Sequence, residues 1–183
     1  GLPFWVEFIM IIVILDFFIW LQHLLSHKIK FLWRIHKIHH SDTEMDVSTA
    51  IRFHPIEIAL SMALKIGLVY ALGADPLSIL IFEILLNGSS MFNHANINIP
   101  NGIDKIIRFV IVTPDMHRIH HSSNRIEHDT NFGFALSIWD HMFRTYKSRP
   151  EKDHKEMEIG LNWQDEKPQE LGWSLGLPFK KNG

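Results

Sequence analysis

The chain has 183 residues, of which 46% are hydrophobic, and its formal net charge is −2 at pH 7. The length suggests a single domain, and the small negative charge excludes nucleic acid as a partner, because phosphate backbones are bound by strongly basic surfaces. The absence of cysteine excludes disulfides, thiolate metal ligands and iron–sulfur clusters.

Three apolar stretches, at residues 4–21, 56–72 and 76–92, are each long enough to cover most of a bilayer crossing. Only the turn Gly-Ala-Asp-Pro at residues 73–76 separates the second from the third, which predicts an antiparallel helical hairpin. We therefore expect an all-α membrane bundle with about three spans here and four in a full chain, since a further segment is expected before Gly1. A soluble all-α bundle is the alternative, because a wholly apolar helix can also lie in a protein core.

Each apolar stretch has a charged side chain in its interior, namely Asp16, Lys65 and Glu83. A charge at the bilayer centre costs roughly 2.5–3.5 kcal/mol on insertion scales. We therefore expect these three side chains to face protein or a polar cavity.

Basic residues are divided unevenly between the two connections. The 73–76 turn has none, whereas the loop after the first stretch has Lys28, Lys30, Arg34, Lys37 and Arg52. The positive-inside rule places this loop in the cytoplasm. The end of the first stretch, the end of the third stretch and the remainder of the chain then lie on the cytoplasmic face.

Beyond Pro100 the chain becomes amphipathic and then polar. Residues 103–112 fit a helix lying along the membrane interface, and Pro114-Asp115 is typical of a helix start. We divide the chain into a membrane domain at 1–147 and a polar C-terminal tail at 148–183, in which Trp163 and Trp173 are expected interfacial anchors.

Thirteen histidines are present, and nine of them follow spacings that are typical of metal sites. They form an HxxxH pair, two HxxHH clusters and an isolated residue: His23 and His27; His36, His39 and His40; His117, His120 and His121; and His94. On a helix, residues at i, i+3 and i+4 share a face, so each HxxHH cluster is expected to aim its three imidazoles at one point. The topology predicted above places all nine on the cytoplasmic face.

Nine imidazoles exceed the ligands of one ion, so the pattern predicts two metals. Nitrogen ligands suit iron, zinc, copper or nickel, not magnesium or calcium. The HExxH protease motif is absent, and the Glu-x-x-His motif of soluble di-iron bundles occurs once, at Glu151 and His154. Two redox metals at a membrane surface predict the binding of O2 and attack on an unactivated C–H bond.

Several motifs resemble the fatty acid hydroxylase / sterol desaturase superfamily of integral-membrane di-iron oxygenases. They are His23-x-x-x-His27, His36-x-x-His39-His40, Arg52-Phe53-His54-Pro55-x-Glu57, Pro114-Asp115-Met116-His117-Arg118-Ile119-His120-His121, Asn131-Phe132-Gly133 and Trp139-Asp140. The resemblance covers roughly residues 5–147. The chain departs from the family pattern at Ser90, where some relatives have histidine, and at Arg144, where glycine is usual.

The resemblance implies transmembrane helices capped by a cytosolic helical lid that carries the histidines, with two irons between them. It implies O2-dependent hydroxylation or desaturation of a fatty acyl chain, sterol, alkylglycerol or carotenoid, and the sequence leaves both reactions open. Zinc can replace iron in a purified or crystallised protein. With no cysteine and no Gly-x-Gly-x-x-Gly, the chain needs an external electron carrier such as cytochrome b5 or a ferredoxin. Its expected docking surface includes Lys28, Lys30, Arg34 and Lys37.

We expect no catalytic side chain beyond the metal ligands. His54, Asp129 and Asp140 are candidates for hydrogen bonding to the ligands, and His54 is equally suited to capping the helix that begins at Pro55. The apolar residues Phe17, Trp20 and Met91 are expected to line the substrate pocket. The alternative function is a membrane metal transporter or metal-binding protein, although transporters bind ions near the bilayer midplane and these clusters lie at its edge.

Overall fold

The computed structural model describes residues 1–154, 156–163 and 168–180. These residues form helices and connecting loops, with two isolated β-bridges and no named strand. The elements in chain order are α1 (Phe4–Lys28), α2 (Lys30–His36), η1 (His39–Ser41), η2 (Val47–Ile51), α3 (Pro55–Leu72), α4 (Pro76–His94), α5 (Asn101–Ile107), α6 (Pro114–His120), α7 (Arg125–His128), α8 (Ile138–Met142), α9 (Leu171–Gly176) and η3 (Leu177–Phe179). The predicted all-α class is confirmed for the described residues.

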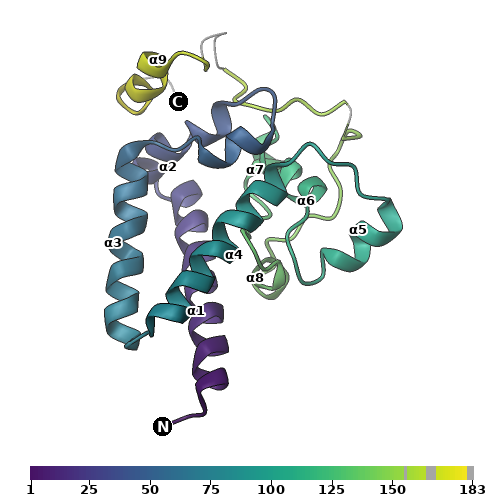
Figure 1. The fold of residues 1–183 in the computed structure, drawn as a ribbon. Coiled ribbons are helices and arrows are strands. Elements are labelled where there is room, and N and C mark those ends of the chain that lie inside the picture. The colour runs from purple at the N-terminus through teal and green to yellow at the C-terminus, as the bar shows by residue number, and fades with distance from the viewer. Residues whose placement is uncertain (155, 164–167, 181–183) are drawn as a thin grey trace.

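The three long helices begin and end where local chemistry directs. Proline opens both α3 and α4 at the first turn, where its missing N–H is no loss, and Asp75 accepts the amides of Leu77 and Ser78 as the N-cap of α4. Gly73 ends α3 with φ 62°, a left-handed conformation that glycine adopts without strain. The predicted hairpin between α3 and α4 is therefore present (Figure 1).

Two helices, α1 and α3, are long and apolar enough to cross a membrane. Only 28% and 6% of their most apolar 18-residue windows are buried against protein, and they expose large apolar side chains such as Trp5, Ile9 and Ile66. Such surfaces fit a lipid environment better than water. The third expected span, α4, falls outside this pair, since Asn87, Ser89, Ser90 and Asn93 interrupt its second half.

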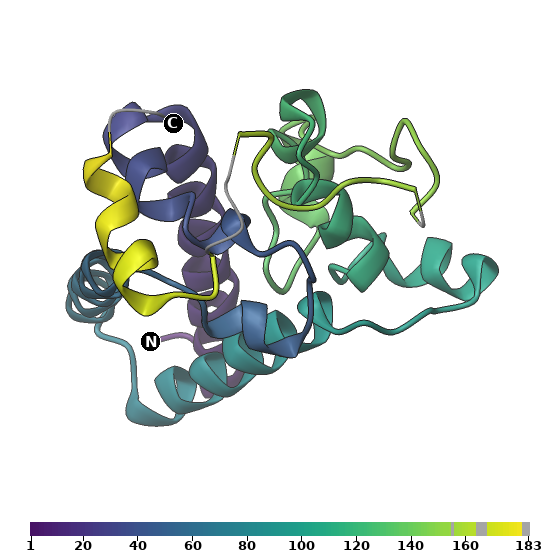
Figure 2. The same cartoon turned by 90° about the horizontal axis from the view of Figure 1, so that it is seen from above.

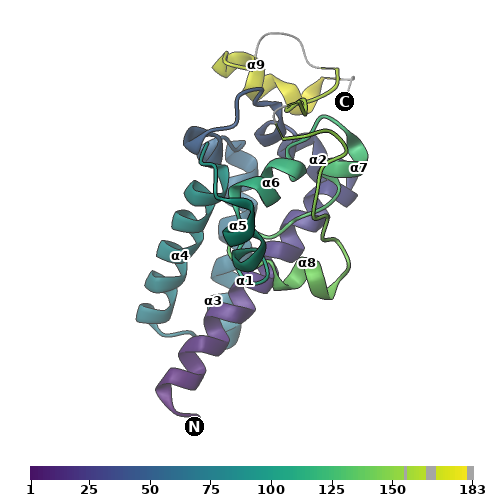
Figure 3. The ribbon, with the colours of Figure 1, turned by 90° about the vertical axis from the view of Figure 1, so that its right-hand side faces the viewer.

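The short elements gather at one end of the long helices. Figure 1 and Figure 3 show α2, α6, α7 and α9 at the end away from the N-terminus, while the α3–α4 turn points the other way. The joint between long helices is apolar: Ile11, Leu15 and Ile19 of α1 form a buried cluster with Phe82 of α4. Burying each such side chain contributes about 1.5–3 kcal/mol.

The end of the described chain, at α9 and η3, folds back onto α2. Trp173 and Leu177 pack against Ile38, and the Nε of Arg34 donates a hydrogen bond to the backbone oxygen of Pro178 at 2.7 Å. Figure 2 shows the yellow α9 segment lying against the α1–α3 side of the molecule. The expectation that Trp173 anchors the chain at a membrane interface is therefore wrong, because its side chain is buried in protein.

Candidate metal centre

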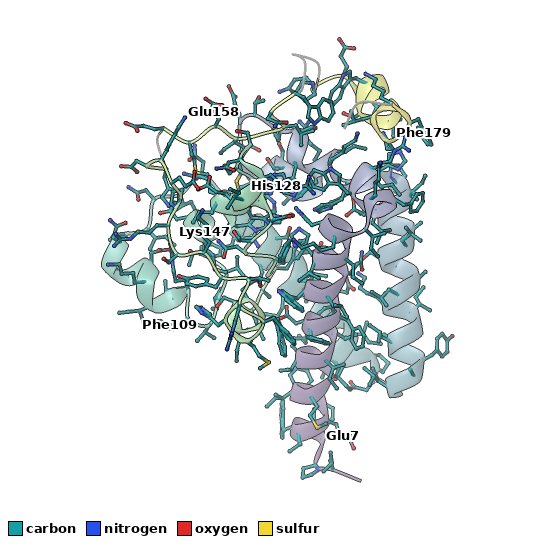
Figure 4. All side chains as sticks on the ribbon, turned by 180° about the vertical axis from the view of Figure 1, so that it is seen from behind. Glu7, Phe109, His128, Lys147, Glu158 and Phe179 are labelled. Carbon is teal, nitrogen blue, oxygen red and sulfur yellow. The ribbon has the colours of Figure 1, made fainter. Side chains whose placement is uncertain are left out.

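All nine clustered histidines meet at one end of the bundle. They come from the last turns of α1, α2 and α4, from η1, and from α6 with its C-cap. Each is at most 6% exposed. Figure 4 shows this region from behind, where the labelled His128 lies near the upper end of α1.

The nine residues divide into two groups that could each hold a metal ion. One contains His23, His27, His36, His40 and His120; the other contains His39, His94, His117 and His121. Within each group the candidate ligand atoms lie within 4.8 Å of one another. No other group in the described residues consists of histidines alone, since the third one combines His27 with His128 and Asp129.

Each HxxHH cluster is shared between the two groups, so the expectation that it aims three imidazoles at one point is wrong. The i, i+4 pairs stay together, as His36 with His40 and His117 with His121, whereas His39 and His120 join the opposite groups. Helix geometry gives the reason for the cluster on α6, whereas in the other cluster α2 ends at His36 and His39 and His40 lie on the short helix η1. Residues at i+3 and i+4 lie on either side of residue i, about 100° apart around the axis.

Hydrogen bonds on the outer side of the cluster fix the proton on several rings. The Nδ1 atoms of His23, His94 and His120 each lie 2.7 Å from a backbone carbonyl oxygen, of Phe132, Ser90 and Thr130 respectively. A carbonyl oxygen can only accept, so Nδ1 carries the hydrogen and Nε2 keeps a lone pair. This is the tautomer in which a histidine binds a metal through Nε2.

Several of the Nε2 lone pairs have no hydrogen-bond donor among the described residues. The Nε2 atoms of His23, His36, His40 and His120 are buried, and none has a hydrogen-bond partner among the described residues. In the second group, the Nε2 of His94 lies 3.1 Å from the Nε2 atoms of both His39 and His117. Nitrogen atoms this close together could bind one ion, because metal–nitrogen bonds are about 2.0–2.1 Å long.

Burial also keeps the rings neutral. It lowers the pKa of His39, His40, His117, His120 and His121 well below its usual value, and neighbouring histidines lower each further. A buried donor set of neutral imidazoles with unpartnered lone pairs fits transition-metal ions, because a cation would satisfy the stranded atoms. The two groups of histidines therefore fit transition-metal ions, iron among them.

Glu57 contacts a candidate metal ligand, a position that the sequence pattern did not predict. Its Oε1 accepts a hydrogen bond from the Nδ1 of His36 at 2.6 Å, in a buried pair. The signal was available, because Glu57 ends the Arg52-Phe53-His54-Pro55-x-Glu57 motif, but sequence spacing alone assigned it no role. A carboxylate in this position orients a ligand imidazole and raises its basicity.

Replacing Glu57 with glutamine is expected to weaken iron binding about 10- to 100-fold, because the amide keeps the shape but loses the charge that supports His36. Chelator competition on the purified protein would measure the change. Glu44→Gln is the matched control, since Glu44 is an exposed glutamate in the loop between η1 and η2. Equal iron retention by both variants would contradict this role for Glu57.

The three expected hydrogen-bonding partners of the ligands have different positions. Asp129 lies beside a candidate ligand, with its Oδ1 3.5 Å from the Nδ1 of His27 and its Oδ2 3.0 Å from the Nζ of Lys28. His54 caps α3, since its Nδ1 accepts the amide of Ile56 at 3.2 Å. Of its two expected roles, the structure therefore shows the cap.

Asp140 does not accept a hydrogen bond from a ligand imidazole, which corrects the third expectation. Its carboxylate accepts the Nε1–H of Trp20 and the backbone amides of Phe132 and Gly133, along with the hydroxyl of Thr145. The carbonyl of Phe132 in turn accepts the Nδ1–H of His23. Asp140 thus acts on the centre through the 132–133 backbone.

Gly133 is packed so closely that a side chain cannot fit there. A Cβ atom would lie 2.7 Å from Val112 Cγ2 and 2.8 Å from the backbone oxygen of Leu136. Gly133→Ala is therefore expected to displace the loop and cost about 1–3 kcal/mol, as overpacking does. Thermal unfolding would measure this against Gly88→Ala, where nothing lies within 4 Å. A similar melting temperature for both variants would contradict it.

A cavity of about 250 Å³ lies between α1, α3 and α4 and reaches the histidines. Its polar lining residues are Gln22, His23, Ser26, His36, Glu57, Ser61, Lys65, Glu83, Asn87 and Ser90. The expected pocket residues Phe17, Trp20 and Met91 do not line this cavity, so that prediction is wrong for it.

Aromatic packing explains why Phe17 and Trp20 lie away from the cavity. Trp20 stacks on Phe143 with ring centroids 4.7 Å apart, and Phe17 contacts Trp139 at 5.1 Å, so both turn toward α8. Met91 is 47% exposed on α4. The rotation of α1 about its own axis, which packing decides, directs Phe17 and Trp20 away from the cavity.

The prediction for the charged residues inside the apolar stretches is confirmed. Lys65 and Glu83 form an ion pair of 2.6 Å and both line the cavity. Asp16 is buried and accepts the Nε1–H of Trp139 at 2.7 Å. All three therefore face protein or a cavity.

The fold and the site define a class of protein: a helical chain with apolar, membrane-compatible helices and a buried polyhistidine centre at one end. The sequence profile of the fatty acid hydroxylase family matches residues 8–145. The chain belongs to this family, and the resemblance found in its sequence is confirmed.

Curated relatives are named for lipid oxidation. The chain is 33% identical to the ornithine lipid hydroxylase OlsE of Rhizobium tropici, over 76% of the chain and 41% of that protein. It is 28% identical to human alkylglycerol monooxygenase, over 75% and 30% of the two chains, and 26% identical to human cholesterol 25-hydroxylase, over 77% and 50%. The chain thus spans half or less of the length of these relatives. No solved structure gives a significant match.

Proposed function

We propose that this protein is a membrane-bound lipid oxygenase that uses O2 to oxidise an unactivated C–H bond at two irons held by its nine clustered histidines. The observation that carries the proposal is the pair of adjoining histidine groups, whose buried nitrogen lone pairs lack partners in the described residues. Family membership supports lipid as the substrate. Hydroxylation is favoured over desaturation, because the relatives compared above are named hydroxylases or monooxygenases.

The proposed membrane arrangement has α1, α3 and α4 as three spans and the short helices as a cytoplasmic cap. At roughly 1.5 Å per residue, the 19-residue α4 is about 28 Å long, close to the thickness of a bilayer core. Its polar residues Glu83, Asn87 and Ser90 line the cavity between the helices, which removes the cost of facing lipid. The basic loop before Arg52 supports the cytoplasmic orientation.

When bound, the irons would supply O2 activation, which amino-acid side chains cannot perform alone. The protein's own residues do the rest. The carbonyls of Phe132, Ser90 and Thr130 hold the Nδ1 protons, so each of these rings presents its Nε2 inward. Near-complete burial of the nine rings keeps bulk water away from the reaction.

The same features weigh against a metal transporter. A transported ion must enter and leave, whereas all nine histidines are at most 6% exposed and three of them are held by backbone hydrogen bonds. The site also lies at the end of the helices and not halfway along them. Permanent cofactors suit such an enclosed centre.

The electrons are expected to come from a separate carrier. Purified protein supplied with NADPH and O2 alone should show no turnover, and cytochrome b5 with its reductase, or a ferredoxin system, should restore it. We expect the docking surface to include fewer basic residues than the sequence suggested. Lys37 is buried against Trp163, and Arg34 donates a hydrogen bond to the backbone of Pro178. Lys30 is exposed and is a basic contact that we expect such a carrier to use.

Lipid mass spectrometry tests the proposed function. Cells expressing the full protein should contain lipids that have gained one oxygen atom, and these should be absent from cells expressing His120→Ala at equal protein level. Loss of two hydrogen atoms would identify desaturation instead. Identical lipid profiles in the two strains, with both proteins folded and in the membrane, would overturn the proposal.

A further inference from the structure

The cavity beside the histidines has several polar side chains set among largely apolar walls. Gln22 of α1, Glu57 and Lys65 of α3, and Glu83 and Ser90 of α4 all line it. Polar side chains inside a membrane bundle are costly and are found where they serve a site. A purely hydrocarbon substrate would offer no partner to those of their polar atoms that the described residues leave unpaired.

Several of these groups lack a hydrogen-bond partner in the described residues. They are the Oε2 of Glu57, the Oε1 of Gln22 and the Oγ of Ser90, and all three atoms are buried. Glu57 and Ser90 are 9% and 8% exposed. The first two atoms can only accept hydrogen bonds, and the third can accept one as well. The cavity therefore calls for a ligand that donates hydrogen bonds.

The Lys65–Glu83 ion pair is placed partway down the cavity walls. Lys65 lies eight residues beyond Glu57 on α3, so it is about 12 Å further from the histidine end. The pair joins α3 to α4 above their hairpin turn, and Glu57 touches His36 at the other end. The polar part of the cavity thus extends about 12 Å along α3 from Glu57, the residue that contacts the centre through His36.

The cavity volume limits what can occupy it. About 250 Å³ is less than the roughly 300–1,000 Å³ of a site that encloses a whole drug-sized ligand. It can hold the polar end of a lipid with a few adjoining carbons, while the remaining hydrocarbon stays among the apolar faces of α1 and α3. A complete lipid does not fit.

We infer that this cavity binds the hydrogen-bond-donating polar end of an amphiphilic lipid, a hydroxyl- or amine-bearing group, through Gln22, Glu57 and the Lys65–Glu83 pair. The inference rests on the proposed lipid oxidation and names its substrate class. It places the oxidised carbon close to the polar end of the lipid, and not deep in an acyl chain, because Glu57, one of the groups that bind this end, contacts the candidate ligand His36.

The test uses the full chain in nanodiscs, freed of metal by a chelator, so that binding is measured apart from oxidation. Two matched lipid pairs serve as probes: glycerol hexadecyl ether against its dimethylated form, and phosphatidylethanolamine against phosphatidylcholine with the same chains. Native mass spectrometry should show at least about tenfold tighter binding for the donor-bearing member of one pair or both, as hydrogen bonds to charged groups provide. The pair that shows it identifies the donor as hydroxyl or amine.

Two variants test the assigned residues. Gln22→Leu removes an acceptor and keeps the volume, and Lys65→Glu combined with Glu83→Lys keeps an ion pair between the helices while reversing its polarity. Both should lower the preference to about threefold or less, whereas Gln169→Leu, at an exposed position, should keep it. If the wild-type chain bound both members of each pair equally, or if both variants kept the full preference, the inference would be overturned.

The oxidation assay separates this inference from the proposed function. Binding of donor-bearing lipids without any lipid oxidation by the iron-loaded protein would reject the function and leave the cavity assignment in place. Oxidation in mid-chain of lipids that lack donors would support the proposed function and reject the cavity assignment.

Discussion

Replacing His120 or His121 with alanine is expected to abolish lipid oxidation and to remove iron from different halves of the centre. These neighbours in sequence belong to different groups, His120 to the group of five and His121 to the group of four. Each variant should therefore lose one iron per chain more readily than the other. Activity should fall by more than the order of 100-fold that removing a ligand's supporting hydrogen bond can cost.

Metal analysis and Mössbauer spectroscopy of the two purified variants would measure this. His141→Ala is the control, because His141 donates only to the backbone oxygen of Arg108 at 3.3 Å and lies outside both groups. It should retain both irons and most of the activity. Full iron content and activity in His120→Ala, or equal losses in His141→Ala, would contradict the assignment.

The same pair of residues shows how far sequence can lead. The spacing predicted His117, His120 and His121 as metal ligands because i, i+3 and i+4 positions share a broad helix face. Spacing could not show that the two groups divide this face, because the division depends on where α1, α2 and α4 deliver their own histidines. That information comes from packing between segments far apart in the chain.

Hydropathy located the long helices well. The expected stretches at 56–72 and 76–92 correspond to α3 (Pro55–Leu72) and α4 (Pro76–His94), because proline starts and the glycine stop are local signals. The first stretch was placed at 4–21, but α1 continues to Lys28 and so carries His23 and His27 on regular helix. Polar residues at a helix end lower hydropathy without interrupting the backbone hydrogen bonds.

At Arg144, where the chain departs from the family pattern, the backbone conformation explains why glycine is the usual residue. The family usually has glycine there, and Arg144 has φ 60°, in the left-handed region that favours glycine. The pocket was less predictable. Its position depends on the rotation of α1, which the contacts of Trp20 and Phe17 with α8 fix, and no local pattern encodes such contacts.

Asp140 is the clearest example of a residue whose motif was visible and whose role was not. Four donors converge on its carboxylate at 2.6–3.1 Å, from Trp20, Phe132, Gly133 and Thr145. Burial raises the pKa of Asp140, and hydrogen bonds from these same four donors oppose that rise. One carboxylate thereby ties α1, the 132–133 backbone and the turn after α8 together.

Asp140→Ala is expected to destabilise the protein by about 3–5 kcal/mol, because it leaves several buried donors unsatisfied at about 1–3 kcal/mol each with partial relief from water. For a chain of this size that corresponds to a melting temperature lower by roughly 10 °C, measurable by thermal unfolding in detergent. Thr145→Val removes one of the four donors and should cost no more than about 1–2 kcal/mol.

Iron retention separates the loop's effect on the centre from general destabilisation. Asp140→Asn keeps the size of the side chain but directs an amide toward groups that donate, so the Phe132 carbonyl should move from the Nδ1 of His23. Iron affinity should then fall about 10- to 100-fold at temperatures where the variant is still folded. A folded Asp140→Asn protein with unchanged iron affinity would show that Asp140 supports the fold alone, because the hydrogen bond between Phe132 and His23 would then have survived without it.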